Sequence, residues 1–301
     1  MENNYHVPVL LRECIEGLNI KPDGVYVDVT FGGGGHSREI LKHLGENGVL
    51  VAFDQDPDAQ RNKIDDPRFH FVDQNFAFLK NNLRLLGYTA VDGILADLGV
   101  SSHQFNEPER GFSTRFDSEL DMRMDKSGKL TAADILNTYS EDQLHKLFGI
   151  YGEVKNAKSL AKSIVSGRID QSINTLADFK KVAGACIPRG KENKYMAQVF
   201  QALRIEVNAE IVVLENFLMQ TAEVLTAGGR LVVMSYHSLE DRPVKNFIAK
   251  GKFKGEVEKD FFGNERKPFK MITRKAVMAD AAELARNSRA RSAKLRIGEK
   301  I

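Results

Sequence analysis

Four consecutive glycines at residues 32–35 constrain the fold of this chain more than any other feature. They follow a β-branched and aromatic run over residues 25–31 and precede residues 37–44, where apolar side chains recur at helical spacing. Glycines between a strand and a helix let the backbone approach a ligand closely, with the amino end of the helix facing that ligand. The pattern predicts a ligand-binding loop of an α/β fold, and a structural turn is the alternative.

The segments after this loop predict a doubly wound, parallel sheet. Strand patterns occupy residues 49–53, 69–72 and 93–97, and residues 75–86 have the pattern of a helix. The run at 49–53 is apolar throughout, as expected for a strand that helices cover on both faces. Repeated alternation of strands and helices implies right-handed crossovers between parallel strands.

The alternation stops after the fourth strand. Residues 101–129 are polar and irregular, whereas residues 131–226 are helical throughout. Ser140 begins a capping-box pattern, and Thr175 precedes another helix. A helical block inserted between two strands of the sheet is the simplest account of this order.

The sheet pattern returns near the carboxyl end. A strand is expected at residues 230–236, after a turn at Gly228 and Gly229, and residues 269–274 and 293–297 alternate as an antiparallel pair. We therefore predict an α/β, doubly wound sheet in two parts with an inserted, all-helical domain. The predicted parts are residues 1–105 and 211–301 for the core and 106–210 for the insert.

The composition is that of an ordinary globular chain, with 42% hydrophobic and 28% charged residues. No apolar run approaches the ~20 residues of a membrane-spanning helix, and no secretory signal is visible. Cys14 and Cys186 are far apart, so we expect a reducing cytoplasm and no thiolate zinc site. No metal-ligand cluster or nucleophilic triad is evident, and neither a metal ion nor covalent catalysis is predicted.

Two details indicate what the glycine loop binds. The dinucleotide fingerprint ends on glycine or alanine, and counted from Gly32 that position is Ser37. Asp28 lies four residues before Gly32, where a carboxylate repels a pyrophosphate and attracts the ammonium of S-adenosylmethionine. The loop is therefore interpreted as the Asp-x-x-x-Gly-x-Gly form of a methyltransferase, and a dehydrogenase is the least favoured alternative.

Two more residues are candidates for cofactor binding. Asp54 ends the second strand, where an acidic side chain accepts both hydrogen bonds of a ribose diol. A helix cap is the alternative for Asp54, but Asp56, with Pro57 after it, already fits that role. Phe76 follows the third strand and is expected either against the adenine or in the core.

The ends of the fourth and fifth predicted strands carry the candidate catalytic residues. In an open α/β sheet, ligands bind beyond the carboxyl ends of the strands. Acceptors placed there can orient an exocyclic amine, which is a poor nucleophile, toward a sulfonium methyl group. A strand-end cap is the alternative for the aspartate, and a hydrogen-bonded turn residue for the histidine. The candidates are Asp97, Ser101, Ser102 and His237.

Eight strings distributed along the chain carry a resemblance to a known family. They are residues 6–10 (HVPVL), 30–37 (TFGGGGHS), 97–102 (DLGVSS), 110–113 (RGFS), 120–125 (LDMRMD), 200–205 (FQALRI), 237–242 (HSLEDR) and 289–292 (RARS). They closely resemble the bacterial ribosomal RNA small-subunit methyltransferase H family, also called MraW. The resemblance covers essentially the whole chain.

This resemblance implies an S-adenosylmethionine-dependent enzyme with a Rossmann-like domain interrupted by a helical one. The implied substrate is the exocyclic N4 amine of a cytidine in 16S rRNA, in the decoding region of the small ribosomal subunit. One departure is Ser288, where the family usually has proline, so the turn before the last strand is expected to be less rigid. The cofactor contacts that the resemblance implies are Gly34, Gly35, His36, Asp54, Phe76, Asp97 and Gln104.

The distribution of basic residues fits an RNA partner, although the net charge of the whole chain is only +2. Lys and Arg concentrate in residues 266–296, which include Arg289 and Arg291, and such a patch fits neutralisation of phosphates. A solvated tail is the alternative.

A second group of arginines, Arg110, Arg115 and Arg123, follows the fourth predicted strand and is expected to hold RNA near the methyl group. The target base must be unstacked to reach the cofactor. Phe112 or Tyr236 is expected either to stack on it or to pack in the wall of the site.

Two other functions remain open at this point. One is a methyltransferase of DNA or of a small molecule on the same fold, because fold alone does not determine the substrate. The other is a non-catalytic, RNA-binding assembly factor that holds S-adenosylmethionine. The general base and the oligomeric state, including a homodimer, are not indicated by the sequence.

Overall fold

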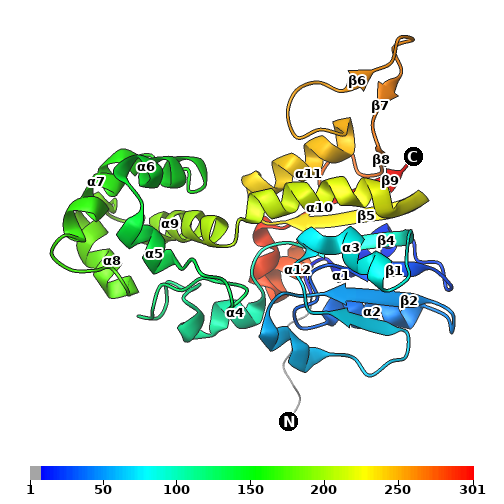
Figure 1. Cartoon of the computed structure of the whole chain (residues 1–301), viewed down its shortest axis with the longest axis horizontal. Helices are drawn as coiled ribbons and strands as arrows, with labels where there is room; N and C mark the ends of the chain where they lie inside the picture. Colours follow the sequence, from blue (N-terminus) through cyan, green and yellow to red (C-terminus); the bar gives the residue numbers. More distant parts are fainter. Residues whose placement is uncertain (1–7) are drawn as a thin grey trace. The chain divides into compact units, whose positions relative to one another are not determined.

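The computed structural model describes residues 8–301, so residues 6 and 7 of the first family-like string lie outside the described residues. The chain divides into two compact units (Figure 1). The core unit contains the chain up to Gly99 together with Ile211–Ile301, and the helical unit is Val100–Glu210.

The core unit is built on a seven-stranded sheet with the order β3-β2-β1-β4-β5-β9-β8 (Figure 1). Strands β1 to β5 are parallel, and β9 pairs antiparallel with both β5 and β8. The predicted parallel sheet and the predicted antiparallel pair are both confirmed. The strands are β1 (Val25–Asp28), β2 (Val49–Phe53), β3 (Phe69–Val72), β4 (Val91–Asp97), β5 (Leu225–Ser235), β8 (Phe269–Met271) and β9 (Lys294–Lys300).

Both faces of the sheet are buried, because side chains alternate along each strand and helices cover both sides. Val27 and Ile94 belong to one apolar cluster, whereas their neighbours Tyr26 and Leu95 belong to another. The helical elements of this unit are α1 (Leu11–Leu18), α2 (Gly35–His43), η1 (Pro57–Asn62), η2 (Phe76–Phe78), α3 (Leu79–Leu85), α10 (Glu210–Val224), α11 (Ser238–Lys250), α12 (Ala281–Arg286) and η5 (Ser288–Ser292).

Strand β5 begins earlier than the sequence pattern predicts. Leu225 pairs with Val91 and Arg230 with Gly93, so the register shifts between these two pairs. Gly228 lies within this irregularity with a φ of 79°. The predicted turn is therefore a bulge inside the strand, since Leu225 is buried and already paired before the glycines.

The helical unit has its own apolar core. Ser140 forms the capping box that the sequence predicts, with Gln143 as its partner. Thr175 precedes a helix as predicted, and it also forms a capping box, with Asp178. Two short helices, α4 and η3, occupy a segment for which an irregular structure was expected. The elements are α4 (Ser102–Asn106), η3 (Pro108–Arg110), α5 (Ala132–Thr138), α6 (Glu141–Ile150), α7 (Ala157–Gly167), α8 (Leu176–Ala183), η4 (Gly184–Cys186) and α9 (Glu192–Val207).

Every helix within residues 8–301 is too short or too polar to cross a lipid bilayer.

Candidate functional site

Three carboxylates gather at the carboxyl edge of the sheet. Asp28 is the last residue of β1, Asp54 follows β2, and Asp97 is the last residue of β4. Strand β1 lies between β2 and β4, so the three strand ends are adjacent. The pKa of Asp54 and of Asp97 is raised to about 6, mainly by burial and in smaller part by the charge of Asp28. This edge of the sheet is therefore acidic, and a cation would stabilise it.

Asp28 stabilises the glycine loop through the hydrogen bonds that its carboxylate accepts. Its side chain is 1% exposed, and the carboxylate accepts hydrogen bonds from Ser37 Oγ (2.7 Å) and from the Thr30 backbone N–H (3.1 Å). Burial raises the pKa of Asp28, although these donors oppose the shift. In this arrangement Asp28 acts on a ligand through its charge, and direct contact with an ammonium group stays a prediction.

Two of the four glycines have backbone angles that favour glycine. Gly32 has a φ of 51° and Gly34 a φ of 74°, both in the left-handed region. Gly34 is the N-cap of α2, and a Cβ on it would lie 2.9 Å from the Phe31 ring. A Cβ on Gly35 would lie 2.3 Å from Pro8 Cγ. The loop can therefore form only with bare backbone at these positions, as a close approach to a ligand also requires.

Asp54 closes the loop on its other side. Its Oδ2 accepts from the Gly32 N–H at 2.7 Å and its Oδ1 from the Asp56 N–H at 2.8 Å. Asp56 caps η1 through the Asp58 N–H, which confirms the predicted cap. The cap is thus filled by Asp56, while binding of a ribose by Asp54 stays a prediction.

Phe76 is half-buried at the start of η2. Its ring meets Phe217 edge to face, with 5.2 Å between the centroids. One side of the ring packs against the core, and the ring keeps some exposed surface. The structure is compatible with both expectations for this residue.

Asp97 is held by three neighbours from different parts of the core unit. Its Oδ1 accepts a hydrogen bond from the Tyr236 hydroxyl at 2.8 Å, and its backbone N–H donates to Thr30 Oγ1 at 2.7 Å. Its Oδ2 lies 3.9 Å from His36 Nδ1, which is too long for a hydrogen bond. The sequence did not indicate Tyr236 as a partner of Asp97, because the two residues lie on different strands and far apart in the chain.

His36 is buried in the first turn of α2, and burial lowers its pKa. Its Nε2 lies 3.2 Å from the Val9 carbonyl oxygen, which can only accept, so the proton of the neutral ring is on Nε2. Nδ1 then presents a lone pair toward Asp97. This arrangement favours a protonated or cation-bound Asp97 over an isolated carboxylate.

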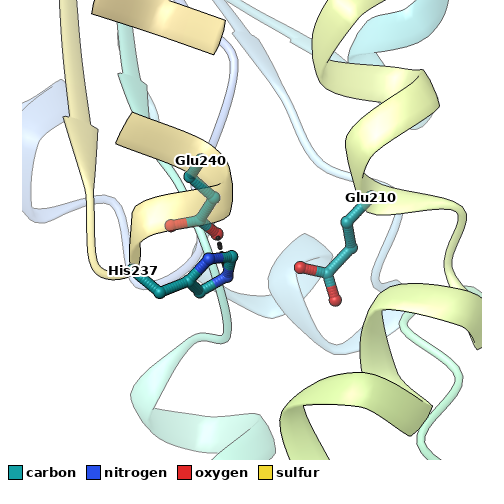
Figure 2. A group of neighbouring side chains, drawn as sticks. All are labelled: Glu210, His237 and Glu240. Atoms are coloured by element: carbon teal, nitrogen blue, oxygen red, sulfur yellow. Dashed lines mark ion pairs between the residues drawn. The ribbon is translucent and has the colours of Figure 1, made fainter. Parts of the chain in front are cut away.

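His237 is the N-cap of α11, and its Nε2 lies 3.1 Å from Oε1 of the buried Glu240 (Figure 2). The other oxygen of Glu240 accepts from the Tyr236 N–H at 2.8 Å. Glu240 therefore links His237 to the residue that bonds Asp97. The pattern of the sequence did not single out Glu240, and a catalytic role of His237 stays a prediction.

Ser101 and Gln104 form a reciprocal capping box at the start of α4. Ser101 Oγ accepts from the Gln104 N–H at 3.1 Å, and Gln104 Oε1 accepts from the Ser101 N–H at 3.0 Å. The spacing Ser-x-x-Gln signals such a box and was not used in the sequence interpretation. Ser102 is the first residue of α4, and its side chain lies outside the described part of the structure.

The arginines expected to bind RNA differ in exposure. Arg110 is buried, and its Nη2 donates to the carbonyls of Arg123 and Met124. This gives Arg110 a structural role in the helical unit that the sequence did not indicate. Arg123 is bound bidentately by Asp121, whereas Arg115 is exposed and lies over the Phe105 ring.

Arg289 and Arg291 lie in η5 of the core unit. Arg291 is exposed and Arg289 is half-buried. Contact of these two arginines, and of Arg110, Arg115 and Arg123, with RNA stays a prediction. Phe112 is buried in the core of the helical unit, which fits packing better than stacking on a base.

The parallel order β3-β2-β1-β4-β5, the glycine loop after β1 and the acidic carboxyl edge define a Rossmann-like fold of the methyltransferase class. The family described as the MraW methylase family matches residues 3–301, and the chain belongs to this family. The resemblance seen in the sequence is confirmed.

Curated relatives cover nearly the full length of the chain. A protein of Cytophaga hutchinsonii named ribosomal RNA small subunit methyltransferase H is 59% identical over 298 residues, covering 98% of this chain and 99% of the relative. Proteins of the same name are 56% identical in Bacteroides thetaiotaomicron and 57% identical in Flavobacterium johnsoniae, each covering 99% of this chain and 98% of the relative.

Proposed function

We propose that this protein transfers a methyl group from S-adenosylmethionine to the exocyclic N4 amine of a cytidine in 16S rRNA, in the decoding region of the small ribosomal subunit. Membership of a methylase family supports the reaction class, and the names of the relatives support rRNA as the substrate. The observation that carries the choice of donor is the group of three carboxylates, Asp28, Asp54 and Asp97, around the glycine loop.

The residues at this edge fit the proposed donor. A sulfonium and an ammonium group both carry positive charge and are stabilised by buried carboxylates, whereas a pyrophosphate would be repelled. Asp54 presents two oxygens at the end of β2, the position that binds ribose hydroxyls in Rossmann-like folds. When bound, S-adenosylmethionine supplies an electrophilic methyl group. The other proposed contacts are Gly32, Gly34, Gly35, His36, Phe76 and Gln104.

Asp97 is the residue that we assign to the acceptor amine. In its ionised form, Oδ2 accepts a hydrogen bond from the N4 amine and aims the nitrogen lone pair at the methyl group. The Tyr236 hydroxyl holds Oδ1 and thereby fixes the orientation of the carboxylate. The nitrogen–methyl bond would form as the sulfur–methyl bond of the donor breaks, which leaves S-adenosylhomocysteine. The nitrogen afterwards loses one proton, for which Asp97 Oδ2 is the adjacent acceptor.

The cytidine must be unpaired to reach this edge of the sheet, because its amine is otherwise engaged in base pairing. The exposed Arg115 and Arg291 are the proposed phosphate contacts. Both are exposed at the surface of their own units, where neutralisation of phosphates makes binding sensitive to salt.

Nucleoside mass spectrometry of rRNA from a strain that lacks the protein tests this function. We expect N4-methylated cytidine to be reduced in 16S rRNA and restored by the wild-type chain but not by Asp97→Ala. Labelled methyl groups on DNA or on a metabolite, and never on 30S particles, would instead identify the other methyltransferase function. If Asp97→Ala restored methylation, the placement of the reaction centre would be wrong.

Calorimetry tests the donor separately. Heat is expected on titration with S-adenosylmethionine and none with a nicotinamide dinucleotide. If methylation failed while RNA and S-adenosylmethionine both bound the wild-type chain, a non-catalytic assembly factor would be the better description.

A further inference from the structure

An aromatic pair is displayed at the tip of a two-stranded ribbon in the core unit. Strands β6 (Glu258–Lys259) and β7 (Glu265–Arg266) project between α11 and β8 (Figure 1). The turn between them carries Phe261 and Phe262, which are 97% and 86% exposed. Their rings meet edge to face, with 5.7 Å between the centroids. Two adjacent, fully presented phenylalanines are costly in water unless they contact a partner.

Polar groups build the turn that presents these rings. Asp260 Oδ1 accepts from the backbone N–H groups of Phe262 and Asn264, both at 2.9 Å, and its Oδ2 accepts from Asn264 Nδ2 at 3.0 Å. Gly263 has a φ of 85°. The conformation of the tip is therefore specified by side-chain and backbone hydrogen bonds, without burial of either phenylalanine.

The two strands of the ribbon are matched by charge. Glu258 pairs with Arg266 and Lys259 with Glu265, so each directly opposed pair joins an acid and a base. Opposite charges across an antiparallel pair stabilise it modestly. The ribbon thus forms without a hydrophobic core of its own, and the apolar surface is confined to the tip.

The base of the ribbon is attached to the core. Phe253 stacks on Phe247, with 5.3 Å between the centroids, and its carbonyl accepts from Asn246 Nδ2 at 2.8 Å. At Gly251, where φ is 71°, a Cβ would lie 2.8 Å from Pro268 Cδ, so the two ends of the segment approach closely. We call this segment, residues 251–268, the arm. Its base is attached to the core and its tip is exposed, as expected for a segment that contacts a partner.

The arm lies near the amino ends of the parallel strands, whereas the acidic residues lie at their carboxyl ends. Strand β9 pairs Lys294 with Ser235 at the end of β5, and Glu299 with Arg230 nearer its start. Phe269, directly after the arm, pairs with Lys300. The arm therefore begins and ends near the start of β5, away from Asp97, and it would contact a part of the partner remote from the reacting group.

Basic residues outnumber acidic ones in the stretch of sequence that contains the arm. Residues 250–275 contain nine Lys or Arg and four Asp or Glu. Within the arm, Lys254 is exposed, whereas Lys252 and Lys267 form ion pairs with Glu258 and Glu265. Aromatic rings among cationic side chains are the combination that binds unpaired nucleotides, because the rings stack on bases while the cations neutralise phosphates.

We propose that Phe261 and Phe262 stack on unpaired bases of the RNA and form a second contact, remote from the methylated cytidine. This rests on the proposed function for the identity of the RNA. A lipid or protein surface would require apolar bulk but not aromatic faces, and this difference makes the proposal testable.

Three double variants of the full chain separate these chemistries. F261A/F262A removes the apolar surface, F261L/F262L keeps it without aromatic faces, and F261Y/F262Y keeps the faces. Leu85→Ala, at a residue 84% exposed on α3, is the matched control for loss of an exposed apolar side chain. The measurements are the Kd for protein-free 16S rRNA and for a short oligoadenylate, together with KM and kcat for methylation.

The alanine and leucine variants are expected to bind both RNAs roughly tenfold more weakly, since losing a stacked base has about this effect. KM should rise with kcat unchanged, and the tyrosine variant and Leu85→Ala should resemble the wild type. The proposal is overturned if the leucine variant keeps full affinity or if the alanine variant loses none. It is also overturned if the alanine variant loses only binding to anionic lipid vesicles or only binding to protein-containing 30S subunits.

The binding assay distinguishes this inference from the proposed function. If the wild type methylates 16S rRNA and the alanine variant binds RNA normally, the arm proposal fails and the proposed function stands. If the wild type methylates no cytidine but F261L/F262L binds RNA more weakly than the wild type does, the proposed function fails and the arm proposal stands.

Discussion

At the scale of single residues, the proposed chemistry depends on the charge of Asp97. Burial raises its pKa to about 6, and the hydrogen bond from Tyr236 opposes this shift. In the proposed step, Asp97 takes the proton of the amine and must therefore be ionised, so methyl transfer is expected to slow about tenfold per pH unit below that pKa.

The first prediction concerns Tyr236→Phe. Loss of the hydroxyl donor should raise the pKa of Asp97 further, so the acid limb of the kcat profile should move to higher pH. Stopped methylation assays between pH 5 and pH 8 measure this limb. Tyr139→Phe is the control, because its hydroxyl donates to Glu206 in the helical unit. An acid limb that stays in place in Tyr236→Phe would show that Asp97 does not control it.

The second prediction concerns stability and pH. Asp54 has a pKa of about 6 in the folded chain and of ~3.9 in the unfolded chain. Its contribution to the free energy of unfolding is therefore fully present below about pH 4 and is lost as pH rises through 6. Asp54→Asn should therefore reduce the loss of unfolding free energy between pH 4.5 and pH 7, measured by urea denaturation. Asp66→Asn is the control, because its pKa of about 2 lies below this window. An unchanged pH slope in Asp54→Asn would contradict the assignment.

How much of the site could be predicted depends on the distance along the chain between partners. Local patterns were sufficient for Asp56 as a cap and for Asp54 and Asp97 as strand-end carboxylates, whereas Asp28 was expected inside a strand run over residues 25–31 and is the last residue of β1. The link from Asp97 through Tyr236 to Glu240 needed the pairing of β4 with β5, which no local pattern encodes. The buried state of Arg110 was missed for the same reason, because its acceptors are backbone carbonyls of a later loop.

At the scale of elements, apolar runs predicted the strands accurately, whereas the predicted starts of the helices were less accurate. The expected strands at 49–53 and 69–72 match β2 and β3. The helix expected at residue 37 begins at Gly35, because Gly34 in the left-handed region serves as its N-cap. The helix expected over 75–86 is a short η2 followed by α3. The predicted domain limits at 105 and 210 compare with unit limits at 99 and 210.

The third prediction concerns Ser288, the first residue of η5. Proline is favoured at such a position because its fixed φ matches the helix and its missing N–H is not needed. The preceding Asn287 has a φ of −139° and a ψ of 92°, in the extended region that a following proline requires. Ser288→Pro should therefore stabilise the chain by about 0.4–1 kcal/mol, measured by chemical denaturation.

The control for Ser288→Pro is the next position in η5. The Arg289 N–H donates to Asn287 Oδ1 at 3.2 Å, so Arg289→Pro should destabilise the chain. Destabilisation by Ser288→Pro as well would indicate that the turn does not have the backbone described above.

At the scale of the whole molecule, the helical unit has the properties of an independent domain. It is one continuous segment, Val100–Glu210, whose buried cluster extends from Phe112 to Leu203. The fourth prediction is that residues 100–210 expressed alone will be helical and unfold cooperatively, as followed by circular dichroism. A matched variant, Phe179→Ala, should lower the stability by about 3–5 kcal/mol because this side chain is fully buried. A broad, non-cooperative transition would show that this unit depends on the rest of the chain.

The hydrogen bonds of Asn208 bear on the order in which the chain folds. Asn208 ties the end of α9 back to Met122 and Met124, near the beginning of the helical unit. Once formed, this tie shortens the effective loop that must close before β4 can pair with β5, and the entropy cost of that closure falls. The helical unit would then nucleate before the central strands pair. A substitution that removes the side-chain hydrogen bonds of Asn208 should therefore slow refolding more than it accelerates unfolding.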